Sequence, residues 1–256
     1  MATSDHLDRA VAFQRDFDHR RAELAVPSAH GTAYLTPTLP RVYDLNGFVV
    51  DLGVSASADE LIAEADEILG SHGLRHRKIA IDDELGRDLT PAFCAASWHA
   101  EELLAMPHVR PAPPIDTSAV HEVEAEELIP VWQARLRRDF GDEDVVSQLV
   151  QAQLGRRTVV DVRYFATRAQ GRVASFCELF SDGRTGQVES VMTEEEFRGR
   201  GLGKAVVAGA LAASQAVHDF TFIVAEAQDW PKELYRKLGF EPAGSMYRFL
   251  LRSKDG

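Results

Sequence analysis

In the second half of the chain, apolar positions follow strand and helix periods in a regular order. Residues 159–167, 172–180 and 187–193 are alternating or continuous apolar runs. Gln170-Gly171 between the first two runs is typical of a tight hairpin, and a second turn with glycines spans residues 182–186. The pattern predicts an antiparallel meander of strands.

Helical periods lie on both sides of this meander. Residues 132–140 and 145–154 repeat apolar side chains at three- and four-residue steps, which predicts two helices before it. Residues 201–217, after it, are apolar nearly all round, so this helix should be buried against the sheet. The remaining predicted elements are a strand at 220–225, a helix at 230–240 and a final strand at 246–251.

The first half has a similar order with weaker periodicity. Ser57 and Glu60 have the spacing of a capping box, which marks the start of a helix. The predicted elements are a helix over 1–25, an irregular segment over 26–46, strands over 47–52, 76–81 and 102–107, and helices over 57–69 and 91–96. The order strand, helix, strand, helix, strand therefore occurs in both halves.

A proline-rich segment separates the halves. Residues 107–114 include four prolines, which disfavour helix and central strand and predict a stiff, extended connection. We place the boundary there, with domains at residues 1–112 and 113–256. The predicted fold class is α/β, with strands and helices mixed in each domain.

Between a predicted strand and a predicted helix lies the segment Arg198-Gly199-Arg200-Gly201-Leu202-Gly203. A glycine-rich turn at a helix N-terminus directs unpaired backbone N–H groups at one point, where they bind phosphate. Lys204 stands where a dinucleotide fingerprint needs a glycine, and Ala205 stands where a Walker A loop needs Ser or Thr. The remaining pattern, Arg-x-x-Gly-x-Gly, predicts a phosphate cradle for a nucleotide-like cofactor.

This motif resembles the acetyl-CoA pyrophosphate arm of the GNAT superfamily of N-acetyltransferases. Leu234-Tyr235-Arg236-Lys237-Leu238-Gly239-Phe240 resembles the second signature of the same superfamily, Leu-Tyr-x-x-Leu-Gly-Phe. The resemblance covers roughly residues 115–256. It implies a mixed, mostly antiparallel sheet flanked by helices and split at its middle, where acetyl-CoA binds.

The first half looks like a degenerate GNAT-like domain, because residues 53–56 carry no pyrophosphate arm. The resemblance then implies two tandem GNAT-like domains with one acetyl-CoA per chain, held by the second domain. For the first domain two roles stay open. The first domain would either form one wall of the acceptor cleft or provide the surface of a homodimer.

The resemblance also assigns roles to single residues. Backbone N–H groups of a splayed strand would contact the pantetheine arm and the oxyanion, and Tyr235 matches the general acid of the family, with simple packing as its alternative. Gln228 stands where the family commonly carries Asn, and this departure puts one contact to the cofactor or to a water molecule in doubt. The residues implied to bind acetyl-CoA are Val191, Met192, Thr193, Arg198, Gly199, Arg200, Gly201, Leu202, Gly203, Lys204, Gln228 and Tyr235.

The catalytic base has three candidates. Glu189 lies two residues before Val191, so both side chains point to the same face of a regular strand, at the cleft. Burial there would raise the pKa of a carboxyl toward useful values. Glu178 on the preceding strand is the second candidate, and a water chain is the third. Glu189 could equally be an exposed carboxylate or bind a cationic substrate.

Charge and composition limit the classes of binding partner that we expect. The chain has 28 basic and 40 acidic residues, a net charge of −12, which opposes nucleic acid and anionic membranes and favours amines. No apolar run approaches the roughly 20 residues that span a bilayer, and no secretory signal is visible. Cys94 and Cys177 form neither a disulfide framework nor a metal cluster, so a cytoplasmic protein without a bound metal is expected.

The sequence thus predicts an acetyl-CoA-dependent N-acetyltransferase that acts on a primary amine of a small molecule or protein. The amine would attack the thioester directly in a ternary complex. The alternative is an acyl-CoA-binding sensor or interaction module without turnover.

Overall fold

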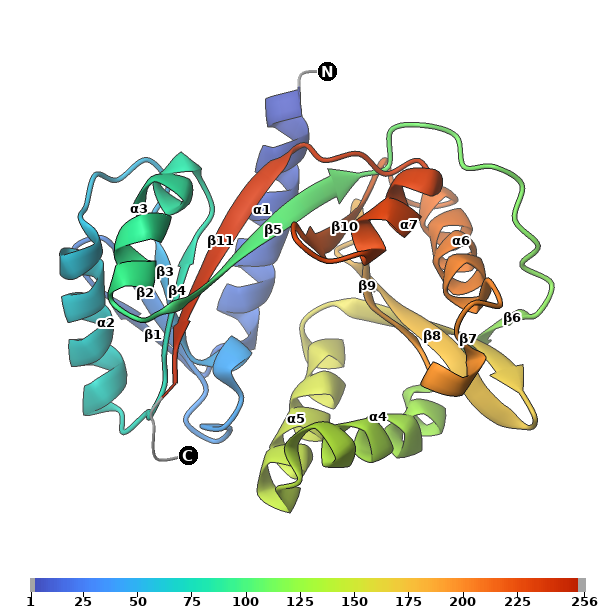
Figure 1. The fold of residues 1–256 in the computed structure, drawn as a ribbon, viewed down its shortest axis with the longest axis horizontal. Helices are drawn as coiled ribbons and strands as arrows, with labels where there is room; N and C mark the ends of the chain where they lie inside the picture. Colours follow the sequence, from blue (N-terminus) through green and yellow to red (C-terminus); the bar gives the residue numbers. More distant parts are fainter. Residues whose placement is uncertain (1–2, 253–256) are drawn as a thin grey trace. The chain divides into compact units, whose positions relative to one another are not determined.

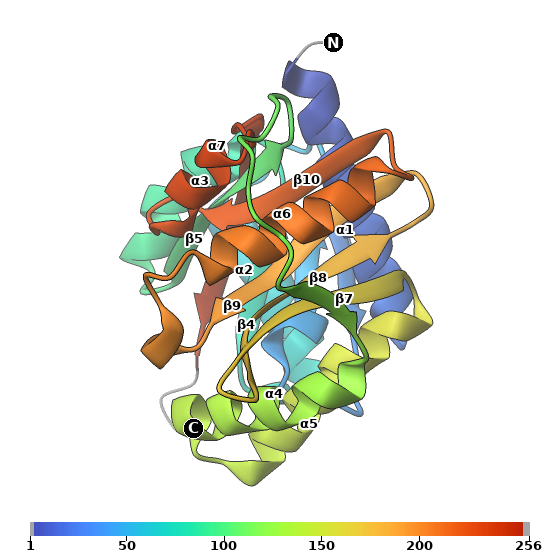
Figure 2. The same cartoon turned by 90° about the vertical axis from the view of Figure 1, so that its right-hand side faces the viewer.

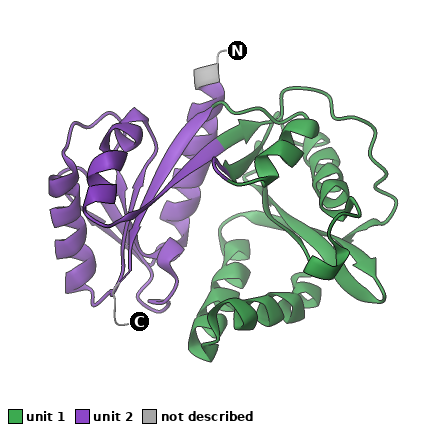
Figure 3. Ribbon diagram, viewed as in Figure 1, with its two compact units in different colours: residues 1–2, 105–225, 229–243 green, residues 3–104, 226–228, 244–256 purple. Residues whose placement is uncertain are grey.

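A computed structural model describes residues 3–252, which form two compact units (Figure 3). Of these residues, unit 1 comprises 105–225 and 229–243, and unit 2 comprises 3–104, 226–228 and 244–252. Each unit is a sheet with helices on it, which confirms the mixed α/β fold class (Figure 1).

In unit 2, five strands follow one another in the order β1, β2, β3, β4, β11. The β3–β4 pair is parallel and the other pairs are antiparallel. The elements are α1 (Thr3–Arg21), β1 (Leu24–Pro27), β2 (Gly31–Leu35), a 3₁₀ turn (Tyr43–Leu45), β3 (Gly47–Val50), α2 (Ala58–Ser71), β4 (Arg77–Ile81), α3 (Glu84–Ala95) and β11 (Gly244–Leu251), with residues 99–104 of β5 (His99–Pro107).

The two faces of this sheet differ in character. Side chains alternate along each strand, and Phe48, Ile79 and Phe249 pack in the core cluster that includes residues of α2 and α3. The opposite face carries Lys78 and Arg248 and is covered by α1 (Figure 1). Helix α2 begins at the predicted capping box, with Ser57 accepting from the Glu60 N–H.

In unit 1, the strand order is β10, β9, β8, β7, β6, with β9 and β10 parallel and the other pairs antiparallel. Helix α6 lies across one face of these strands (Figure 2), and α4 and α5 pack on the other. The elements are β6 (Val120–Val123), α4 (Ala125–Phe140), α5 (Glu143–Gly155), β7 (Asp161–Ala169), β8 (Arg172–Ser181), β9 (Thr185–Thr193), α6 (Leu202–Gln215), β10 (Phe220–Glu226) and α7 (Pro231–Lys237), with short 3₁₀ turns at Arg156–Thr158 and Glu195–Phe197.

The two units do not divide the chain at the predicted boundary after residue 112. Strand β11, expected to complete the C-terminal domain, pairs with β4 in unit 2. In unit 1 the place expected for the final strand is taken by residues at the start of the proline-rich segment, since the His108 N–H donates to Thr221 O at 2.8 Å and the Glu241 N–H to Pro107 O at 3.0 Å. Sequence order alone does not reveal which sheet a terminal strand joins.

Gly239 shows how closely unit 1 packs around this connection. The backbone N–H groups of Val109 and Arg110 both donate to Gly239 O, at 3.0 and 3.1 Å. Gly239 has φ +92, and a Cβ there would lie 2.0 Å from Arg110 O. Only glycine meets both demands, so the Leu-Gly-Phe end of the second motif has a structural cause in this fold.

Three further expectations need correction. Residues 26–46, expected to be irregular, contain the second strand β2 and part of β1, because the alternation in Gly31–Leu35 is short and lies next to prolines. The helix expected at 91–96 is α3, which starts at Glu84 behind the N-cap Asp83 and holds Pro91 within it. Strand β6 was not predicted.

No helix among residues 3–252 is long and apolar enough to cross a membrane. Over the same residues, no group of three or more His, Cys, Asp or Glu side chains is arranged to hold a metal ion.

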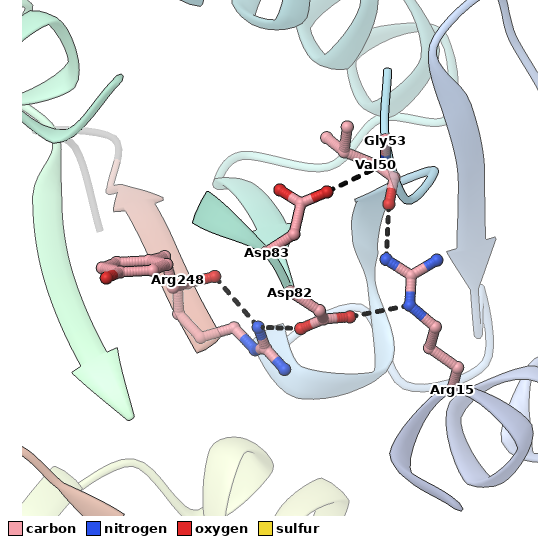
Figure 4. A network of polar contacts seen from close by, with 7 residues as sticks. Arg15, Val50, Gly53, Asp82, Asp83 and Arg248 are labelled. Atoms are coloured by element: carbon pink, nitrogen blue, oxygen red, sulfur yellow. Dashed lines mark hydrogen bonds and ion pairs between the residues drawn. The ribbon is translucent and has the colours of Figure 1, made fainter. Parts of the chain in front are cut away.

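A buried ionic network ties three elements of unit 2 together (Figure 4). Asp82, 4% exposed, follows β4 and accepts from Arg15 Nε at 2.9 Å and from Arg248 Nη1 at 2.7 Å. Burial would raise the pKa of the Asp82 carboxyl, but the charges of Arg248 and Arg15 outweigh burial and hold the pKa below its ordinary value. The ionised carboxylate therefore stabilises the folded unit.

We expect Asp82→Asn to lower the free energy of unfolding by about 3 kcal/mol at neutral pH, because it leaves two guanidinium groups without their buried partner. A carboxyl whose pKa is depressed on folding stabilises the protein above its unfolded pKa and loses this effect as the pH falls through its folded pKa. The destabilisation caused by Asp82→Asn should therefore be smaller at acid pH. Urea unfolding at several pH values measures it, and an equal loss for the exposed control Asp88→Asn would contradict the network's role.

Candidate active site

Strands β9 and β10 of unit 1 pair over only part of their length. The parallel ladder runs from Thr185 and Phe220 to Val188 and Ile223 and stops there. Beyond it, residues 189–193 have no ladder partner on β10 within the described chain, although Glu189, Met192 and Thr193 keep partners on β8. The sheet is split at this point, and one edge of β9 presents backbone groups that an extended ligand can pair with.

A bulge in β9 lies at the start of the split. Phe176 pairs with Met192 and Glu178 pairs with Glu189, so the single residue between them on β8 faces two residues on β9. One of the two, Ser190, has φ +53, a backbone conformation that costs a residue other than glycine about 1–3 kcal/mol. Local contacts must hold this strained conformation in place.

Two side chains supply those contacts. The Ser190 N–H donates to Glu189 Oε1 at 3.0 Å, and its hydroxyl oxygen accepts from Arg156 Nη1 at 3.1 Å. The same Arg156 nitrogen donates to Glu178 Oε2 at 2.8 Å. Arg156, just after α5, therefore links the bulge to the neighbouring strand.

Glu178 and Glu189 belong to a polar row across three strands. Tyr164 on β7 pairs with Glu178, which pairs with Glu189, so all three side chains lie on one face of the sheet. Tyr164 packs in the cluster that α4 and α5 form with this face, at 5.9 Å from the Trp132 ring. The row therefore lies on the side of the sheet opposite α6.

The two carboxylates of the row differ in environment. Glu178 is 1% exposed, and its Oε1 and the Tyr164 hydroxyl are buried without a partner among the described residues. Burial raises the pKa of Glu178, while Arg156 counteracts it, and burial together with the Glu178 charge raises the pKa of Tyr164 to about 12. Glu189 is only half-buried, and its hydrogen bonds within residues 3–252, from Gln187 Nε2 at 2.6 Å and from the Ser190 N–H, both come from its own strand. Glu189 is thus the carboxylate that a ligand can reach.

Tyr235 lies on α7 and is 6% exposed. Burial raises the pKa of its hydroxyl, and the charge of Glu189 adds to the effect. No hydrogen bond to this hydroxyl occurs within residues 3–252, and the atom is not sealed from solvent. Tyr235 is therefore a protonated donor close to Glu189, free to donate to a ligand.

Cys177 lies under the bulge on the α6 side. It is fully buried, its thiol donates to Val206 O at 3.3 Å, and burial raises its pKa. These are the properties of a small buried hydrophobic residue, as its sequence context predicts, and a thiol in this state is a poor nucleophile.

The glycine-rich turn leads from β9 to an uncapped helix. Gly199 and Gly201 have φ +76 and +79, and a Cβ on either would meet no atom within 4 Å. Helix α6 begins at Leu202 with no side-chain cap and no acidic residue in its first turn. Open space, free N–H groups and the exposed Arg198 and Arg200 fit a diphosphate. Gly203 and Lys204 lie in this first turn.

In unit 2, backbone groups at the corresponding position already have hydrogen-bond partners. There the N–H of Gly53 donates to Asp83 Oδ2 at 2.9 Å, and Arg15 Nη2 donates to Val50 O at 2.6 Å, at the end of the parallel β3–β4 pair (Figure 4). Ser57 and Glu60 take up N–H groups at the start of α2. The backbone groups that are free in unit 1 are used internally in unit 2.

Most of the predicted site residues lie together in unit 1, but Gln228 does not belong to that group. Gln228 is exposed and falls within residues 226–228, which are part of unit 2. Sequence reasoning missed Arg156, Ser190 and Tyr164. No local signal marks a serine with positive φ, and the roles of Arg156 and Tyr164 depend on contacts with strands more than 10 residues away.

Residues 161–242 match the family described as the acetyltransferase (GNAT) domain, which spans β7 to Phe240 and includes the split, the turn and Tyr235. No curated protein matches the chain in sequence.

Several solved structures share the fold over nearly the whole chain. A functionally unknown conserved protein from Staphylococcus epidermidis is 15% identical, with a TM-score of 0.67 over 89% of this chain and 93% of that one. A GCN5-related N-acetyltransferase from Kribbella flavida is 16% identical, with a TM-score of 0.62 over 96% and 95%. A tandem GNAT protein from the clavulanic acid biosynthesis pathway is 17% identical, with a TM-score of 0.55 over 91% and 82%.

At these low identities the solved structures support only the fold, whereas the family match concerns residues 161–242, most of which lie in unit 1. Together they support the two-domain arrangement and a degenerate first half. Residues 161–242 therefore match an acetyltransferase (GNAT) domain, and the chain as a whole shares its fold with GCN5-related N-acetyltransferases of known structure.

Proposed function

We propose that this protein is an N-acetyltransferase that moves an acetyl group from acetyl-CoA to a primary amine by direct attack in a ternary complex. The observation that carries the proposal is the combination, in unit 1, of a split strand edge, an uncapped glycine turn and a protonated Tyr235 near Glu189. Each part serves a different section of one extended thioester substrate.

The donor would bind along β9 and α6. The N–H groups of residues 199–204 and the arginines of the turn suit the diphosphate. The free edge at Val191, Met192 and Thr193 suits the amide groups of the pantetheine arm, in the manner of an added strand. One N–H of this edge would also stabilise the negative charge that develops on the thioester oxygen.

Two side chains would move protons. Glu189 takes a proton from the attacking amine, because it is the carboxylate of the row that a ligand can reach. Tyr235 returns a proton to the departing thiolate, because burial keeps its hydroxyl protonated. Glu178, sealed and paired with Arg156, would position the bulge that carries Glu189.

The acceptor would approach from the face of the carboxylate row. Glu189 favours a cationic amine there, and the net charge of −12 attracts cations over longer distances. We therefore propose an amine of a small molecule or a protein as the acceptor.

Gly201→Glu should abolish binding of acetyl-CoA, because the new carboxylate occupies the diphosphate position. Gly171→Glu is a matched control, since Gly171 also has positive φ and open space around it but lies in the β7–β8 turn. Calorimetric titration measures both. Undiminished affinity in Gly201→Glu, with the control also unchanged, would refute the assignment of the turn.

Glu189→Gln should lower turnover by about 10²–10⁴-fold, because the attacking amine loses its proton acceptor. Turnover is followed as thiol release from acetyl-CoA with a panel of amines. Unchanged turnover in Glu189→Gln would exclude Glu189 as the base and leave Glu178 or a water chain. Acetyl-CoA binding without release for any amine would favour the sensor alternative.

Tyr235→Phe should lower turnover by about 10²-fold and change the affinity for acetyl-CoA less than twofold, since only a proton donor is lost. In the wild-type protein the raised pKa predicts no loss of rate from Tyr235 ionisation up to about pH 10. Pre-steady-state and binding measurements on both proteins separate these effects. Unchanged turnover would remove Tyr235 from the mechanism.

A further inference from the structure

Gln187 is a buried polar residue in an apolar part of the unit 1 sheet. It is 1% exposed, and its neighbours in the ladders are Phe180 on β8 and Phe222 on β10, both of which are buried. Residues side by side in a sheet point to the same face, so the Gln187 amide has a buried phenyl ring on each side. An amide at such a position costs free energy unless its hydrogen bonds are made there.

The Gln187 amide donates to the carboxylate of Glu189. Its Nε2 lies 2.6 Å from Glu189 Oε2, and the two residues, two positions apart, share one face of β9. Gln187 still belongs to the parallel ladder with β10, whereas Glu189 is the first residue beyond the end of that ladder. The contact therefore joins the start of the open strand edge to the closed part of the sheet.

Both oxygens of the Glu189 carboxylate are held by neutral donors. The Ser190 N–H donates to Oε1 at 3.0 Å, and Gln187 donates to Oε2. A carboxylate offers about four lone-pair sites, so each oxygen keeps one for a ligand. The nearby guanidinium group of Arg156 donates to Glu178 and to the Ser190 hydroxyl. A neutral amide opposes protonation of a carboxylate less than a guanidinium group does, so these donors orient Glu189 and leave it able to accept a proton.

The orientation of a glutamate base limits its rate. The side chain is long and flexible, and a base acts only while its oxygen lies within hydrogen-bond reach of the proton that it removes. Glu189 is half-buried and lies at an open strand edge. A fixed donor that holds one oxygen raises the share of time that the carboxylate spends in the reactive geometry.

We propose that Gln187 is a positioning residue, which holds the carboxylate of Glu189 in the orientation that accepts the proton of the attacking amine. Gln187 has this role only if Glu189 is the base, so the assignment rests on the proposed function. It accounts for a buried amide at a position where an apolar side chain would pack against Phe180 and Phe222.

Two substitutions remove the contact in different ways. Gln187→Met removes the donor and keeps the length of the side chain, and Gln187→Asn keeps a buried amide but draws it back from Glu189. Both should lower kcat about tenfold and change KM for acetyl-CoA by less than about twofold, because Gln187 acts on the base and not on the acyl donor. Thiol release from acetyl-CoA with the panel of amines measures both constants. Thr167→Val, which removes a fully buried hydroxyl on β7, is the matched control and should leave kcat unchanged.

Gln187→Met in the Glu189→Gln background separates positioning from a structural role. With no carboxylate to orient, the added substitution should lower kcat no further. A similar loss in both backgrounds, or unchanged kcat in both Gln187 variants while Glu189→Gln is slow, would overturn the assignment of Gln187 and leave the proposed function standing. Unchanged kcat in Glu189→Gln, or no turnover by the wild-type protein, would count against the proposed function and overturn the assignment with it.

Discussion

The separation of β9 from β10 after Val188 and Ile223 is the constraint on which the rest of unit 1 depends. A sheet normally closes every backbone group into its ladders, so a strand edge left open inside a domain needs support. Here the support comes from the bulge at Ser190, which the Arg156–Glu178 pair anchors from the neighbouring strand. The same bulge directly follows Glu189, so the open strand edge and the carboxylate that we propose as the base lie next to each other on one strand.

In unit 2 the corresponding strand, helix and strand leave fewer backbone groups without a partner. Its parallel pair, β3 and β4, also leads into a helix, but Arg15, Asp83 and a capping box use the backbone groups that unit 1 leaves free. At this step from strand to helix, the two units thus differ in the side chains that occupy the backbone N–H groups. This difference agrees with the proposal that only unit 1 binds the acyl donor.

The features that the sequence predicted well are those with local causes. The glycine turn, the meander and the helix with Tyr235 follow from periodicity and from residues with special backbone freedom, such as Gly201 and Gly239. The features it missed arise from contacts distant in sequence. Strand β11 joins β4, and Arg156 reaches Glu178 and Ser190, because of packing that no local pattern encodes.

Hydrogen exchange on the full chain, measured by mass spectrometry with and without acetyl-CoA, tests the central claim most directly. The account predicts slower exchange in residues 189–204, where the open strand edge and the glycine turn would pair with the donor. It also predicts no change in residues 50–60, where the backbone groups already have partners. Protection of residues 50–60, or none at 189–204 under saturating acetyl-CoA, would contradict it.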